Sequence, residues 1–391
     1  MPALPSSLIS SVSCAPALTV AETAGGLLEA LAGVPDPRAR RGVRHRLAVV
    51  VTAAVCAVVA GYRSYAAIGE WVADVPATTA LALGMTPERR PSEAMIRRLL
   101  QAMDPQLLTG AIGVWLAGRA TATTSTSGRV IAVDGNALHG SRTTDTAARH
   151  VMTACDHATG VVLASIDVDG KTNEITRFAP LLDQISDLRD TVITPDALHC
   201  QRQHVTYLAQ HGAHWILTVK GHQPSLHSQL AGLPRQAVPD ATRNRNRDRG
   251  HGRREIRSLK ILTISTGIDV PHAAQAIQTR RRRHRLEQPK RFTTETVHTI
   301  TDLRVHQAKP AQLADWIRGH WSIKNKVHWG RDITYDEDRS QIRTGTGPEV
   351  MAALRNAAIG ALRLTGVTNI TATNRHHARD STRPLALPGI T

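Results

Sequence analysis

Two aspartates, Asp134 and Asp196, each follow a short apolar run that is typical of a buried strand. The runs are Val130–Val133 before the first aspartate and Thr191–Thr194, followed by a proline, before the second. Carboxylate oxygens are the ligands that Mg²⁺ prefers, and two such ions about 3.5 to 4 Å apart stabilise both the attacking and the leaving oxygen of a phosphodiester. An aspartate at a strand end also commonly caps a turn. The pair is therefore a candidate metal site for phosphodiester chemistry, with turn capping as the alternative.

The order of the surrounding elements determines whether the two aspartates can meet. The pattern predicts strands at 130–133, 151–155 and 161–168, a helix at 175–188, a strand at 191–194, a helix at 201–211 and a strand at 215–219. This order is typical of an RNase H-like sheet, in which the first and fourth strands lie side by side. We therefore expect the α/β class, with an RNase H-like mixed sheet flanked by helices, and both aspartates at one edge of that sheet.

Changes in composition divide the rest of the chain. We expect a flexible N-terminus (1–23), a helical DNA-binding domain (24–118), a Thr/Ser-rich linker (119–128), the first part of the core (129–230), a strand-rich basic insertion (231–310), a C-terminal helical part of the core (311–366) and a polar tail (367–391). Within the last helical part, Trp321, His328 and Trp329 are expected to pack in the core, with base stacking as the alternative.

The charge of the chain favours a polyanionic partner. The 391 residues include 48 Lys and Arg against 32 Asp and Glu, a formal charge of +16. Nucleic acid is the first candidate and an acidic membrane surface the second. Five arginines lie in the basic turn Arg38–Arg46, which is either a phosphate-contacting arm, with Arg38, Arg40 and Arg41, or a solvated loop.

We expect no membrane span and no export. The longest apolar run, Leu47–Ala60, has about 14 residues where a bilayer needs about 20, so it is predicted to be a buried helix. The first residues lack the basic segment of a secretion signal, and the four dispersed cysteines suit a reducing compartment. These features predict a cytoplasmic, nucleoid-associated protein.

Many short motifs follow one another in a single order along the chain. They are Asp36-Pro37-Arg38 with Arg41-Gly42, Pro91-Ser92-Glu93, Val133-Asp134-Gly135, Lys171-Thr172-Asn173-Glu174, Asp196-Ala197, Lys220 with Gln223, His251-Gly252-Arg253, His320-Trp321-Ser322-Ile323, His328-Trp329, Asp332-Ile333-Thr334-Tyr335 and Arg355-Asn356. In these motifs, from about residue 25 to about residue 370, the chain resembles the H-repeat-associated, ISAs-type transposases of bacterial insertion sequences. Those proteins belong to the DDE superfamily and have an RNase H-like catalytic core.

The resemblance implies a DNA transposase that uses Mg²⁺ or Mn²⁺ to cut strands at the ends of its element and to join them to target DNA. Asp134 and Asp196 would be the first two acids of the catalytic triad. The third should be a glutamate in the local pattern Ile-Glu-Asn, but this chain has Ile323-Lys324-Asn325. Lys324 therefore occupies the position of the expected acid, and we expect this copy to be catalytically impaired unless Asp332, Glu337 or Asp338 replaces it.

The expected partners are double-stranded DNA, at element ends and target, and a second copy of the chain, because two ends must be held together. The residues expected to contact DNA outside the basic turn are Lys171, Lys220, Arg253 and Arg331. Related transposases place a basic residue where Arg331 stands. The alternative function is a non-catalytic DNA-binding remnant that represses related elements, and a metal nuclease of another family is a third possibility.

Overall fold

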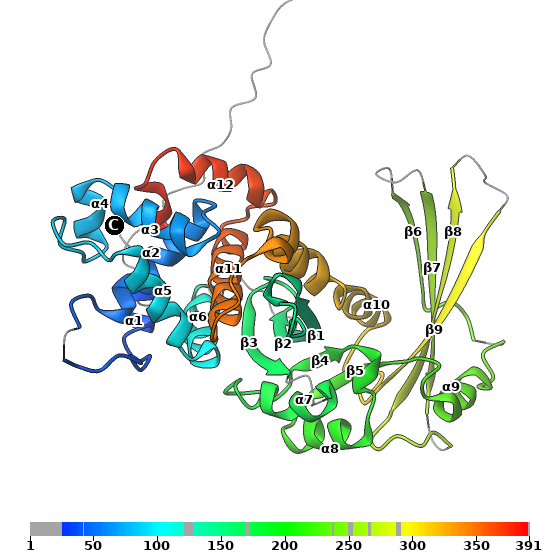
Figure 1. Cartoon of the computed structure of the whole chain (residues 1–391). Coiled ribbons are helices and arrows are strands. Elements are labelled where there is room, and N and C mark those ends of the chain that lie inside the picture. Colours follow the sequence, from blue (N-terminus) through cyan, green and yellow to red (C-terminus); the bar gives the residue numbers. More distant parts are fainter. Residues whose placement is uncertain are drawn as a thin grey trace, which may run out of the picture.

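The computed structural model describes residues 26–41, 43–120, 128–168, 173–236, 238–248, 253–264, 267–286 and 291–389. Within these ranges one nine-stranded sheet has the strand order β3-β2-β1-β4-β5-β9-β8-β7-β6. Helices of the N-terminal and C-terminal parts of the chain cover the β3 end, whereas β6 to β9 extend away from them at the other end (Figure 1).

The first five strands and two helices have the predicted order, which confirms the expected fold class. They are β1 (Val130–Leu138), β2 (Arg149–Asp156), β3 (Val162–Val168), α7 (Glu174–Leu182), β4 (Val192–Pro195), α8 (Arg202–Gln210) and β5 (His214–Val219). β1 pairs antiparallel with β2 and parallel with β4. The predicted end of β1 at Val133 is wrong. Pairing with β2 carries the strand on to Leu138, so Asp134 lies within β1 rather than at its tip.

The basic insertion continues the core sheet instead of forming a separate module. After α9 (Pro224–Ala231) it contributes β6 (Thr242–Asp248), β7 (Arg253–Thr263), β8 (Gln275–Arg285) and β9 (Thr293–Thr301). β9 pairs antiparallel with β5, with Ile216 opposite Thr301. A shared apolar cluster includes Val192 of the first part and Ile277 of the extension. The predicted boundary at residue 231 is therefore not a break in the sheet.

The N-terminal part is helical, as predicted. Its helices are α1 (Leu27–Ala30), α2 (Leu47–Val59), α3 (Tyr65–Asp74), α4 (Ala77–Ala82), α5 (Glu93–Ala102) and α6 (Pro105–Ala120). The predicted buried helix is α2, and the Ser92 side chain caps α5 by accepting a hydrogen bond from the Met95 backbone N–H. Because α6 runs to Ala120, the expected linker begins later than residue 119, and residues 121–127 lie outside the described ranges.

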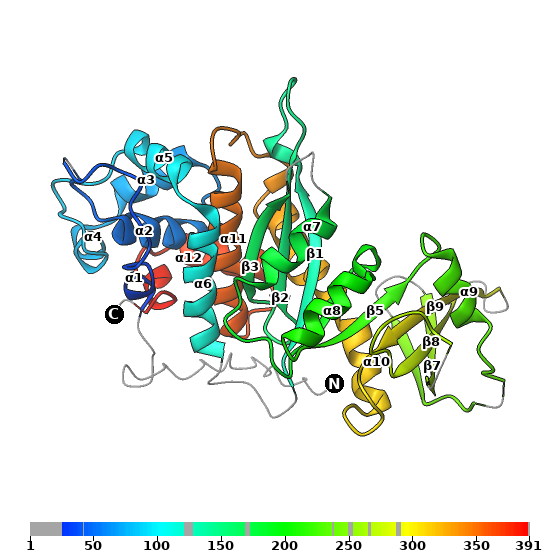
Figure 2. The same ribbon diagram turned by 90° about the horizontal axis from the view of Figure 1, so that it is seen from below.

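The C-terminal part holds the helical layer and the sheet together. It consists of α10 (Pro310–Gly319), two π-helical turns (Lys324–His328 and Gly330–Thr334), α11 (Gly347–Leu364) and α12 (Ile370–Ala378). α11 is almost fully buried, and it packs on α2 and α6 on one side and on β3 on the other (Figure 2). The expected polar tail is wrong in the described range up to residue 389, because α12 and the turn Arg383–Ala386 are folded there. No helix of the described ranges is long and apolar enough to cross a bilayer.

Candidate catalytic site

The register of two parallel strands places Asp134 and Asp196 together. Val133 of β1 lies opposite Pro195 of β4, and this is the last pair of the parallel ladder. The two aspartates directly follow that pair, and the Asp196 backbone N–H donates a 3.2 Å hydrogen bond to the Val133 carbonyl. The sequence prediction that the two carboxylates share one sheet edge therefore agrees with the backbone geometry.

Asp134 is the buried member of the pair. Its side chain is 5% exposed, and its Oδ2 atom lies near two side-chain nitrogen atoms but accepts no hydrogen bond from the described residues. Lys324 Nζ lies 3.5 Å from this oxygen and His328 Nδ1 lies 3.6 Å from it. Burial raises the pKa of Asp134 to about 6, and the charge of Asp196 acts in the same direction, whereas Lys324 lowers it.

Asp196 is more exposed and more firmly anionic. Burial raises the pKa of this carboxyl, but the hydrogen bond from the Ala197 backbone N–H and the nearby Lys220 ammonium outweigh burial, so the net shift is downward. Lys220 Nζ lies 3.2 Å from Asp196 Oδ1. Asp196 also caps the short turn Ala197–His199, so the same residue both caps a turn and lies close to Asp134.

Lys324 reaches the site from the first π-helical turn. Ile323 and Val327 on this turn are fully buried against Ala132 and Val162, and this packing sets Lys324 beside β1. A π-helical turn inside a helix is frequent at functional sites because it redirects side chains. The Lys324 side chain is 45% exposed, and its ammonium lies 5.2 Å from the Trp321 ring.

None of the three acids proposed as replacements joins Asp134 and Asp196. Glu337 is buried between Arg331 at 3.0 Å and Arg355 at 2.8 Å. Asp332 lies near Asp338 and Glu337, and burial together with these two acids raises its pKa to about 6. Within the residues that the structure covers, no group of three or more His, Cys, Asp or Glu side chains could hold a metal ion.

The residues expected to contact DNA are placed very differently from one another. Arg38 pairs with Asp36 at 2.7 Å and lines a hollow of about 610 Å³ beside α5, together with the exposed Arg41. Arg40 is also exposed. Arg331 is 0% exposed and paired with Glu337, so this conformation does not present it to DNA.

The side chains of two other residues that were predicted to contact DNA lie outside the described part of the structure. Lys171 lies outside the described residues, and for Arg253 only the backbone, at the start of β7, is described. The core prediction for two aromatic residues is wrong, because Trp321 and Trp329 are each 54% exposed. His328, in contrast, is buried as predicted.

Sequence reasoning missed a network beside Asp134. Glu174 of α7 contacts His150 of β2 at 2.5 Å and His199 at 3.5 Å. A Cβ atom at Gly135 would collide with the ends of the Glu174 and His150 side chains, so a larger residue after Asp134 would displace this pair. The sequence did contain a signal for this network, the motif that ends at Glu174. The role of Glu174 could not be inferred from that motif because its histidine partners are distant in sequence.

Comparison with known proteins identifies the family. The sequence model of the family described as "Transposase DDE domain" matches residues 125–360, and that described as "DDE_Tnp_1-associated" matches residues 28–116. The chain belongs to the DDE transposase family. The family-level resemblance found in the sequence motifs is thereby confirmed.

Relatives of this DDE transposase have consistent names. It is 26% identical over 357 residues to "Putative transposase YncI" of Escherichia coli O157:H7, covering 86% of the chain and 87% of the relative. It is 25% identical over 349 residues to "H repeat-associated putative transposase YhhI" of Escherichia coli K12, covering 86% and 90%. A piggyBac transposase complex with hairpin DNA has a TM-score of 0.41 and 11% identity over 93% of this chain and 75% of the other. At this TM-score the similarity supports no further conclusion.

Proposed function

We propose that this DDE transposase binds double-stranded DNA at the ends of a bacterial insertion sequence, and that its own strand cleavage and transfer are impaired by Lys324. The observation that carries the proposal is the 3.5 Å contact between Lys324 Nζ and Asp134 Oδ2. In this contact an ammonium stands beside the buried carboxylate where the third acid of the family is expected. The protein would act in the cytoplasm, at the nucleoid.

The side chains present do not fit a pair of divalent ions. The family generally uses divalent metals, and Asp134 and Asp196 are oxygen donors of the type that Mg²⁺ or Mn²⁺ requires. A third acidic ligand is missing from the described residues around them. At an effective dielectric constant of about 20, a unit charge about 4 Å from a divalent ion contributes roughly 8 kcal/mol of repulsion. Solvent screening of the 45% exposed Lys324 reduces this repulsion without reversing its sign.

The remaining features of the chain support DNA binding independently of cleavage. The formal charge of +16 and the exposed arginines of the basic turn suit a phosphate backbone. We propose a homodimer on DNA because transposition joins two ends, and each copy would bring one end.

The experiment that tests impairment is the substitution Lys324→Glu. We expect the variant to bind Mn²⁺ at least tenfold more tightly than the unchanged protein, by calorimetry, and to gain metal-dependent cutting of a plasmid that carries the DNA flanking the gene. The matched control is Lys326→Glu. It changes the charge equally, but Lys326 donates hydrogen bonds to the His157 and Ala158 carbonyls instead of facing Asp134.

Metal-dependent cutting by the unchanged protein would overturn the proposed impairment, and so would equal Mn²⁺ affinity in all three proteins.

The second candidate function is a non-catalytic DNA-binding repressor. The ion pair between Lys324 and Asp134 favours it as well, because this pair would impair cleavage without changing the basic surfaces that could bind DNA. It predicts that Lys324→Glu gains metal binding without excision of the element, while the unchanged protein still binds DNA.

A further inference from the structure

The two faces of β8 differ in how their arginines are neutralised. Successive side chains of a strand point to opposite faces of the sheet. On one face Arg281 Nε lies 2.7 Å from Glu255 Oε2, and Arg283 Nη2 lies 2.7 Å from Glu295 Oε2. The positive charge of this face is therefore largely compensated within the sheet.

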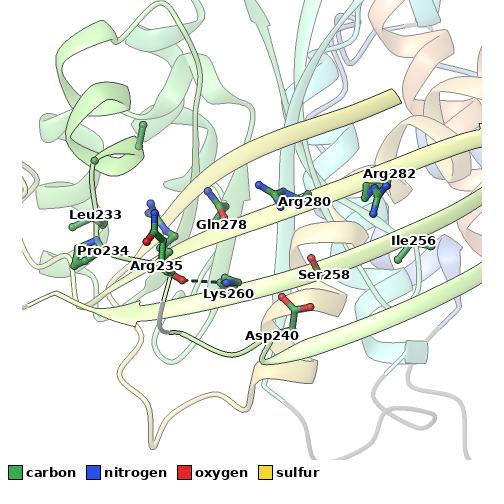
Figure 3. Close-up of a pocket in the computed structure, with 13 residues that line it drawn as sticks. Leu233, Pro234, Arg235, Asp240, Ile256, Ser258, Lys260, Gln278, Arg280 and Arg282 are labelled. Atoms are coloured by element: carbon green, nitrogen blue, oxygen red, sulfur yellow. Dashed lines mark hydrogen bonds between the residues drawn. The ribbon is translucent and has the colours of Figure 1, made fainter. Parts of the chain in front are cut away.

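The opposite face, which carries Arg280 and Arg282, has no such compensation. Both arginines are exposed, and neither forms an ion pair with any described residue, although Arg282 lies 4.5 Å from the Phe292 ring. They line a hollow of about 950 Å³ together with Lys260 of β7 and Arg235 (Figure 3). Asp240 is the carboxylate of the lining, and within the described residues it makes no ion pair.

Arg235 gives a second, independent indication of an anionic ligand. Its side chain is 6% exposed and lines the hollow, yet its Nε and Nη2 atoms find no hydrogen-bond partner in the described structure. Its Nη1 atom donates to the Leu230 carbonyl, and Lys260 Nζ donates a 3.1 Å hydrogen bond to the Arg235 carbonyl. A buried hydrogen-bond donor without a partner destabilises the fold, so an incoming acceptor would be bound favourably.

We propose that this surface, defined by Arg235, Lys260, Arg280 and Arg282 and here called the Arg280 face, binds phosphates of duplex DNA outside the Asp134 site. Two residues along a strand separate Arg280 from Arg282 by roughly 6.7 Å, so the cations form a row, which suits a linear polyanion better than a single ion. The inference rests on the proposed function as a DNA-binding protein. It assigns the DNA contact within β8 to the arginines of one face of the strand.

The test compares two double variants of the full chain with the same change in charge. Binding of a duplex of about 30 base pairs is measured by fluorescence anisotropy in EDTA, as a function of salt. For Arg280→Gln with Arg282→Gln we expect at least a tenfold loss of affinity and a salt slope reduced by about 2, since each phosphate contact contributes about 0.9. For the control, Arg281→Gln with Arg283→Gln, we expect less than a threefold loss.

Equal losses in the two variants, or no loss in either, would overturn the assignment. Should the control fail to fold when its pairs with Glu255 and Glu295 are broken, Arg189→Gln with Arg339→Gln provides a second control at exposed arginines with carboxylate partners. Complete absence of duplex binding by the unchanged protein would instead overturn the proposed DNA-binding function. EDTA removes divalent metal ions and so prevents DNA cleavage during the binding measurement. The result therefore does not depend on whether Lys324 impairs cleavage.

Discussion

Asp134 and Asp196 have different pKa values because their surroundings differ. Asp134 is buried, and burial raises its pKa to about 6 even with the Lys324 ammonium nearby. Asp196 is 41% exposed and has Lys220 beside it, so it remains anionic. The Lys324 ammonium lowers the pKa of Asp134, and in the proposed function it also opposes the binding of a metal ion at this carboxylate.

The His150–Glu174 pair predicts a measurable dependence of stability on pH. The hydrogen bond with His150 and the 3.5 Å contact with His199 lower the pKa of Glu174 to about 2, and the bond to Glu174 raises the pKa of His150. The contribution of Glu174 is present above its ordinary pKa of 4.5 and is lost as the pH falls toward 2. The contribution of His150 is complete below its ordinary value of 6.5 and is lost as the pH rises through the raised pKa.

The pair is therefore strongest between these two ordinary values, and His150→Gln should reduce the free energy of unfolding most at pH 5.5. We expect a loss on the order of 1 to 2 kcal/mol there, allowing for the partial exposure of both side chains, and less than half of it at pH 9. Urea unfolding at the two pH values measures the difference. His306→Gln, at an exposed loop position, should be neutral at both. Equal losses at pH 5.5 and pH 9 would contradict the argument.

At the scale of elements, the sequence predicted the parts of the site that depend on local pattern and strand order. The strand patterns before Asp134 and Asp196 can be read directly from the sequence, and the parallel pairing of β1 with β4 brings the two residues together although they are far apart in sequence. The extension of β1 past Val133 was missed because Asp134, Gly135 and Asn136 interrupt the apolar run, and their pairing with β2 is a tertiary effect. The exposure of Trp329 was missed because this residue lies between the two π-helical turns, which shift the side-chain period away from the 3.6 that pattern reasoning assumes.

The pairing of β9 with β5 lay beyond sequence reasoning for a similar reason. Its register is set by contacts between strands about 80 residues apart, where many alternative pairings of basic, polar strands have comparable local patterns. The burial of Arg331 also depends on tertiary contacts. This residue was expected to contact DNA, whereas a buried carboxylate from a later turn, Glu337, binds it.

The buried ion-pair cluster around Glu337 links the second π-helical turn to α11 and yields the next prediction. Glu337 is paired with Arg331 and Arg355, and the arginine side chains are 0% and 2% exposed. Glu337→Gln would leave two buried guanidinium groups without a counter-charge, so we expect about 3 kcal/mol less stability toward urea. The matched change Glu295→Gln breaks an exposed pair with Arg283 and should cost less than about 1 kcal/mol. Similar small losses for both would show that the cluster is not stabilising.

At the scale of the whole molecule, the C-terminal segment returns to the N-terminal helices. The turn Arg383–Ala386 packs on α2, and the Leu27 backbone N–H donates a 2.9 Å hydrogen bond to the Pro388 carbonyl. In Figure 1 the blue α2 and the red α12 lie on the same side of α11, although they are far apart in sequence. The N-terminal helices and the core are therefore joined in one apolar cluster by the last described residues, among them Leu385 and Leu387.

This closure predicts that Leu385 stabilises the N-terminal helices even though it lies more than 300 residues from α2. Its side chain is 7% exposed within the shared cluster, so Leu385→Ala should lower the free energy of unfolding by about 2 to 3 kcal/mol through lost burial and an unfilled cavity. Leu81→Ala, at a side chain that is 60% exposed on α4, should change the free energy of unfolding by less than about 0.5 kcal/mol.

Hydrogen exchange shows which part of the molecule Leu385 stabilises. Faster exchange of α2 amides in the Leu385 variant, with β6 to β9 unchanged, is expected because α2 packs on this turn whereas the strand extension lies at the opposite end of the sheet. Uniform acceleration in both regions would instead mean that the segment stabilises the molecule as a single cooperative unit.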